Sequence, residues 1–103
     1  MSRLPDSNRE DRARLMRGAV LLACYQAYPN SLFVETIDYL LEEFELSEEE
    51  LGKDLHWMKE LGLLEMGQSR VIGLKMEKIK LTTKGYALAK RIDPKHPVMP
   101  EVD

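Results

Sequence analysis

The chain of 103 residues lacks several features that mark common classes of protein. It contains one cysteine, Cys24, so it has neither an internal disulfide nor the thiolate ligands of a metal sensor. Its longest apolar run, residues 19–25, is far shorter than the ~20 residues that span a bilayer. Its first residues, MSRLPDSNRED, are too polar for a secretory signal. These absences predict a cytoplasmic single-domain protein with no membrane segment, in which Cys24 is a buried small hydrophobe.

Motifs for catalysis and ligand binding are also missing. The glycines are scattered singly, so no glycine-rich phosphate loop is present. His56 and His96 have no neighbouring cysteine and lack the spacing of a metal site. A nucleophile pair of Cys24 and His56 is disfavoured by the apolar setting of the thiol, and the adjacent acids Glu42 and Glu43 fit a solvated face better than acid–base catalysis. The sequence therefore predicts no enzyme activity, cofactor or metal, and it indicates no small-molecule ligand.

Basic residues are absent from a long central part of the chain. Residues 18–52 contain eight acids and no Lys or Arg, whereas residues 53–92 hold nine basic groups against four acids. The net charge of −3 argues against strong non-specific binding of nucleic acid, but the second block leaves room for a local basic surface. Solvated faces without a partner explain each block equally well.

Capping residues and apolar periodicity predict the first two helices. The capping box from Ser7 to Glu10 predicts a helix that begins near residue 8 and ends at Pro29. Because its residues 19–25 are apolar nearly all round, this helix is expected to be the central core helix, a subunit interface, or both. A second helix is expected over residues 32–44, with apolar residues on one stripe and acids opposite.

A third helix is the clearest element of the sequence. Ser47 is a good N-cap after a tight turn, and Gly62 is the expected C-terminal stop. At 100° per residue, one face is expected to be buried and comprises Leu51, Asp54, Leu55, Met58 and Leu61. The opposite, solvated face carries Glu49, Lys53, His56 and Glu60, flanked by Trp57.

Strand patterns follow the third helix. Residues 63–66 are expected to form a short strand, and residues 70–74 and 77–82 a hairpin with its tip near Lys75 and Met76. Thr83 is expected to cap a last helix over residues 84–92. The proline-rich residues 93–103 predict an extended or disordered tail outside a domain of residues 1–92.

This order of elements resembles the winged helix-turn-helix, a mainly α fold with a small β-hairpin called the wing. Over residues 31–92 the resemblance rests on a two-residue turn before a Ser-capped helix and on two sequence stretches, LHWMKELGLLEM and KLTTKGYALA. The first stretch is similar to the end of the recognition helix in multiple-antibiotic-resistance and arsenical-repressor-like regulators. The second is similar to the LTxxG step by which such chains leave the wing. The resemblance implies DNA binding.

Nearly the whole chain also resembles a small protein of Mu-like phages and prophages. The residues that carry this resemblance are a first helix rich in Asp and Arg, the stretch DLHWMKELGL, the LTTKG step and the proline-containing tail. The hairpin region is longer here than is expected for that family. The resemblance implies a winged fold, a phage origin, DNA binding and no catalytic activity.

Candidate DNA contacts come from two of these elements. The third helix offers Lys53, His56 and Trp57, but three acids in its first turn, residues 48–50, repel phosphates while they stabilise the helix dipole. The wing is the better candidate, because its basic residues are placed to line one strand of phosphates. These residues are Arg70, Lys75, Lys78 and Lys80, with Lys84 at the start of the next helix. Lysines that only protect an edge strand from aggregation explain the same pattern equally well.

Two functions therefore remain open. The first is a winged-helix DNA-binding protein, a small phage or prophage transcriptional regulator that contacts double-stranded DNA mainly through its wing. It is expected to be a homodimer through the first helix, with phosphate contacts from the arginines of that helix. The second is a non-catalytic protein-interaction or assembly module on the same scaffold, which uses the acidic surface of residues 35–50.

Overall fold

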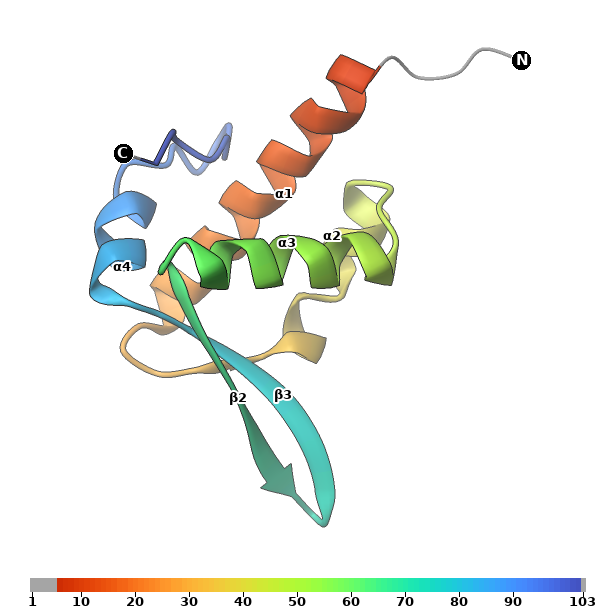
Figure 1. The fold of residues 1–103 in the computed structure, drawn as a ribbon, viewed down its shortest axis with the longest axis vertical. Coiled ribbons are helices and arrows are strands. Elements are labelled where there is room, and N and C mark those ends of the chain that lie inside the picture. The colour runs from red at the N-terminus through yellow and green to blue at the C-terminus, as the bar shows by residue number, and fades with distance from the viewer. Residues whose placement is uncertain (1–5, 103) are drawn as a thin grey trace.

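A computed structural model describes residues 6–102, without the side chains of residues 6–9 and 71. The elements in chain order are α1 (Asp6–Ala27), β1 (Leu32–Phe33), the 3-10 helix η1 (Val34–Ile37), α2 (Tyr39–Glu43), α3 (Glu48–Glu60), β2 (Leu64–Val71), β3 (Leu74–Leu81) and α4 (Thr83–Ala89). The strands form one antiparallel sheet in the order β1-β3-β2, and the far end of the β2–β3 hairpin extends away from the helices (Figure 1). Four helices with this small sheet are the winged helix-turn-helix that the sequence predicts. None of the helices within residues 6–102 is long and apolar enough to cross a bilayer.

The core lies between α1, α3 and the base of the sheet. Its buried side chains include Met16, Val20, Leu21 and Cys24 from α1, Leu55 and Met58 from α3, and Ile79 and Leu81 from β3. The predicted inner face of α3 is confirmed, since Leu51 and Asp54 are buried as well. Burial raises the pKa of the Cys24 thiol to about 12, so this cysteine is an unreactive core residue, as predicted.

The prediction of one continuous helix over residues 32–44 is wrong. Residues 32–33 instead pair with β3, where Leu32 lies opposite Ile79, and a 3-10 turn follows before the five residues of α2. The β-branched residues of η1, among them Val34 and Ile37, have a low helix propensity, and the partner strand lies more than forty residues along the chain. Helical periodicity could not report a pairing between residues so far apart.

The hairpin also differs from the prediction in its turn. Strand β2 is one continuous strand of eight residues, and β3 pairs with it from Val71 opposite Leu74 to Leu64 opposite Leu81. The two-residue turn is therefore Ile72-Gly73, not Lys75-Met76, and both turn residues have positive φ, +51° and +79°. Positive φ at both positions is typical of a type I′ turn, which fits the right-handed twist of a two-stranded ribbon.

Helix ends agree with the sequence at α3 and shift elsewhere. The hydroxyl of Ser47 accepts a hydrogen bond from the backbone N–H of Glu50, and the Glu50 carboxylate accepts one from the N–H of Ser47, which completes a capping box. Ser7 lies within α1 rather than at its cap. Helix α4 is capped by Thr82 rather than by Thr83, and it ends at residue 89 rather than 92.

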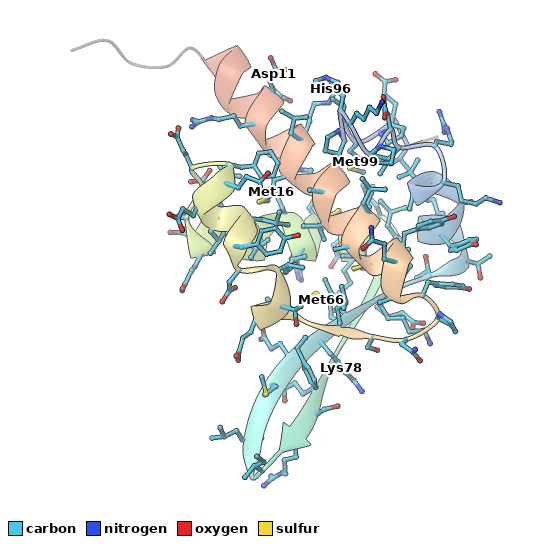
Figure 2. All side chains as sticks on the ribbon, turned by 180° about the vertical axis from the view of Figure 1, so that it is seen from behind. Asp11, Met16, Met66, Lys78, His96 and Met99 are labelled. Carbon is cyan, nitrogen blue, oxygen red and sulfur yellow. The ribbon has the colours of Figure 1, made fainter. Side chains whose placement is uncertain are left out.

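The C-terminal tail packs on the body of the protein, against the prediction of an unpacked segment. It has no regular secondary structure, but Met99 is only 4% exposed and its N–H donates a hydrogen bond to the carbonyl of Arg14. Figure 2 shows His96 and Met99 beside α1. A Cβ at Gly18 would overlap the carbonyl oxygen of Pro97, so the absent side chain of Gly18 makes room for the tail.

Candidate nucleic-acid interface

The candidate interface consists of the solvated side of α3 and the wing, residues 64–81. The turn that joins them is held by two side chains that follow the wing, where the chain enters α4. The hydroxyl of Thr82 donates to the carbonyl of Gly62 at 2.6 Å, and Nζ of Lys84 donates to the carbonyl of Leu61 at 3.0 Å. These bonds fix the wing relative to α3. They also engage the ammonium of Lys84 at the negative end of the helix dipole, so this predicted DNA contact has a structural role.

The solvated face of α3 carries little free positive charge. Nζ of Lys53 lies 3.4 Å from a carboxylate oxygen of Glu49, and Nε2 of His56 lies 3.3 Å from a carboxylate oxygen of Glu60. Each pair spans one helical turn, the spacing at which opposite charges attract. Both predicted contacts, Lys53 and His56, are exposed, but each faces an acid on its own helix. This face is therefore poorly suited to neutralise phosphates.

Trp57 packs against α1 rather than the second helix. The guanidinium carbon of Arg17 lies 4.6 Å from the centre of the Trp57 ring, and Nη2 of Arg17 lies 3.0 Å from a carboxylate oxygen of Asp54. The pKa of Asp54 is raised, mainly because burial disfavours the charged carboxylate. The hydrogen bond and positive charge of Arg17 oppose this rise, and the negative charge of Glu50 adds to it. Arg17 thus links α1 to α3, and Trp57, still 43% exposed, covers that link.

Arg12 is also tied to the protein through its side chain, and Arg14 contacts the tail through its backbone. Nη1 of Arg12 forms an ion pair of 2.9 Å with Glu45, in the turn before α3. The backbone carbonyl of Arg14 accepts a hydrogen bond from the N–H of Met99 in the tail. Arg14 also lines a hollow of about 450 Å³ beside Trp57. The side chain of Arg9 lies outside the described residues. The prediction that this helix supplies phosphate contacts stays a prediction.

The basic residues of the wing do not form one line. Residues that are directly opposite across an antiparallel pair lie on the same face, and successive residues alternate. Arg70 lies opposite Lys75, on the face that also carries the buried Ile79 at the wing's base. Lys78 and Lys80 lie on the other face, at the base of the wing, where Figure 2 labels Lys78. The predicted contacts are therefore divided into a pair near the tip and a pair at the base.

The two pairs differ in their surroundings. At the base, Lys80 lies opposite Glu65, and both lysines of this face line a shallow hollow with that acid. Arg70 and Lys75 lie within two residues of the turn, on a part of the hairpin that no helix covers (Figure 1). Their positive charge is the more accessible one for an anionic partner.

The wing tip is also apolar. Ile72 is 97% exposed and Leu74 is 68% exposed, and these are the two most exposed large hydrophobic residues among residues 10–70 and 72–102. Sequence reasoning missed Ile72, because it placed the turn three residues later. Gly73 was the available signal, since an isolated glycine between two strand-like runs often marks a hairpin turn.

A hollow of about 420 Å³ separates α3 from the base of the wing. Its apolar floor includes Leu51, Leu55 and Met66, and the acids Asp38, Glu48 and Glu77 lie at its walls. The three carboxylates give this hollow a negative charge that would repel phosphates. Among the side chains that the structure describes, no three His, Cys, Asp or Glu residues gather closely enough to hold a metal ion.

Two solved structures are similar to this chain over most of its length. A PadR-like transcription factor from Bacteroides fragilis has a TM-score of 0.63 at 20% identity, and the match covers 84% of each chain. A variant of ZitR from Lactococcus lactis in its apo form has a TM-score of 0.54 at 19% identity, over 82% of this chain and 59% of the other. No model of a protein family matches the sequence, and no curated protein matches it significantly. At these identities the likeness shows the fold, and it confirms a winged helix.

Proposed function

We propose that this protein is a winged-helix DNA-binding regulator that contacts duplex DNA mainly through its wing. The observation that carries the proposal is the pair Arg70 and Lys75, which lie opposite each other on the projecting part of the hairpin. Among the described residues, neither has a carboxylate within ion-pair distance, whereas Lys53 and His56 on α3 each have one. Neutralising phosphates dominates affinity for DNA, so the free pair governs binding and α3 adds only modest base selection.

Two features outside this chain's own geometry support the proposal. The similar protein from Bacteroides fragilis is a PadR-like transcription factor, so a winged helix of similar arrangement serves transcription there. The sequence resemblance to a protein of Mu-like phages adds that this regulator acts in the cytoplasm of a bacterial host. The regulator is also proposed to work as a homodimer through α1, whose Leu22 and Ala23 are only half buried in the single chain.

Fluorescence anisotropy with a random duplex of about 25 base pairs, at about 50 mM salt, tests the function. The variant R70E/K75E is expected to weaken binding at least about tenfold and to reduce the slope of log K against log salt by about 2. The matched control R91E/K95E makes the same change of charge in the segment that follows α4, away from the tip of the wing (Figure 1). It is expected to leave the salt slope unchanged. Wild-type protein that binds no duplex at this salt concentration would falsify the proposal.

The acidic hollow between α3 and the wing supports a second candidate, a protein-interaction module for a basic partner. Asp38, Glu48 and Glu77 surround an apolar floor there, an arrangement that suits the stem and charge of a lysine side chain. This candidate predicts salt-sensitive association with a basic protein and loss of that association in the variant D38N/E48Q/E77Q. Partners that remain bound to the variant at full strength would count against it.

A further inference from the structure

The tip of the wing combines two features that each cost folding stability. Ile72 has a φ of +51°, and a β-branched residue in the left-handed region is strained. Its side chain is 97% exposed, so burial offsets none of that strain. Arg70 and Lys75 lie directly opposite each other on one face, where like charges repel. A turn selected for folding alone would carry Asn, Asp or Gly in place of Ile72, so these features point to a role in binding.

We propose that Ile72 is an apolar wedge that enters the minor groove of duplex DNA, flanked by phosphate contacts from Arg70 and Lys75. The proposal rests on the proposed function and names the part of the duplex that the wing recognises. Directly opposed residues of an antiparallel pair have Cβ atoms about 5 Å apart, and the minor groove is about 6 Å wide. Long side chains at that spacing reach the phosphates on the two sides of the groove. A whole two-stranded ribbon needs the wider major groove, so only the tip enters.

The chemistry of the tip favours DNA over a second copy of the chain as its occupant. Isoleucine and leucine side chains that enter the minor groove separate neighbouring base pairs and kink the duplex. Leu74, 68% exposed, enlarges the apolar tip beside Ile72. An apolar contact between two copies would bring both sets of Arg70 and Lys75 together, and their charges would repel. Pyrimidine–purine steps unstack most easily, so the wedge predicts a preference for duplexes with a central TA step.

Two substitutions at one position separate the wedge from the phosphate contacts. In I72N the apolar side chain is lost, but asparagine accepts the left-handed backbone, so the variant is expected to fold with an undiminished Tm. In I72M an apolar side chain of similar size remains. Energy transfer between dyes at the two ends of a duplex of about 30 base pairs with a central TA step reports bending, and anisotropy reports affinity. Wild type and I72M are expected to bend the duplex.

I72N is expected to bind without bending, with affinity lower by about tenfold and an unchanged slope of log K against log salt. Bending by I72N equal to that of wild type overturns the wedge and leaves the proposed function intact. A wild type that binds no duplex overturns both. A third result would also overturn the wedge. If I72N abolishes self-association in a sedimentation experiment but leaves DNA binding unchanged, Ile72 is a contact between two copies of the chain.

Discussion

At the scale of single residues, the contact of Arg17 with Asp54 shows how an apparent DNA-binding arginine becomes part of the fold. The two residues lie 37 positions apart, and the arginine meets the carboxylate at 3.0 Å and the ring of Trp57 at 4.6 Å. Burial is the main cause of the raised pKa of Asp54, and the charge and hydrogen bond of Arg17 lower that pKa. At pH values between the unfolded and the folded pKa of Asp54, the folded state therefore holds a proton that the unfolded state has released. Asp54 contributes stability that is full below its unfolded pKa and is lost as pH rises through its folded pKa.

Substitution R17M tests this link. Because Arg17 lowers the pKa of Asp54, its removal raises that pKa further, and ionising the carboxyl then costs more stability. The variant is expected to lose about 2–3 kcal/mol at pH 7 and less as the pH falls and a larger fraction of Asp54 becomes protonated. Urea unfolding at three pH values measures the difference. The control R12M breaks a surface ion pair with Glu45 and is expected to cost under about 1 kcal/mol. An equal cost for R17M at every pH would contradict the link.

At the scale of elements, local patterns predicted α3 correctly because its determinants are local. Its N-cap Ser47, its apolar stripe and its stop at Gly62 lie within one stretch of sixteen residues, and Gly62 has the positive φ of a helix C-cap. The ion pairs of Lys53 and His56 are equally local, since each partner lies one turn away. The division of residues 32–44 and the separation of the wing's basic residues could not be predicted, because both depend on the register with β3.

The LTTKG stretch has a physical meaning in this fold. The hydroxyl of Thr82 accepts a hydrogen bond from the N–H of Gly85 and so caps α4. Gly85 is buried where α4 meets the turn after α3, and a Cβ there would overlap the carbonyl oxygen of Leu63. The stretch thus joins the end of the wing, the start of α4 and the end of α3 at one point. That junction holds the wing in place.

Substitution G85A is expected to destabilise the protein by about 1–3 kcal/mol, because the new methyl group overpacks this junction. G52A is the matched control, since Gly52 also lies within a helix but has no atom near its missing Cβ. It is expected to stabilise the protein by about 0.5–1 kcal/mol, through the better helix propensity of alanine. Thermal unfolding measures both. Stabilisation by G85A as well as by G52A would show that the Leu63 contact does not restrict Gly85.

At the scale of the whole molecule, the C-terminal tail connects the last helix, α4, to the first helix, α1. It follows α4, returns along α1 and buries Met99 beside Gly18. It therefore forms one wall of the hollow that Arg14 and Trp57 line. A composition rich in proline predicts the absence of regular structure in the tail, but not its packing, because that packing depends on a glycine about eighty residues earlier.

A double-mutant cycle tests the packing of the tail. Removing residues 94–103 is expected to cost about 2 kcal/mol, mainly from the exposure of the surface that Met99 covers. In the full chain G18A is expected to cost a similar amount, because its methyl group displaces the Pro97 carbonyl. In the shortened chain no carbonyl opposes the methyl group, so G18A is expected to be neutral or stabilising by about 0.5–1 kcal/mol. Urea unfolding of the four proteins measures the coupling, with G52A expected to have the same effect in both chains. A G18A cost that is the same in both chains would place the tail elsewhere than on α1.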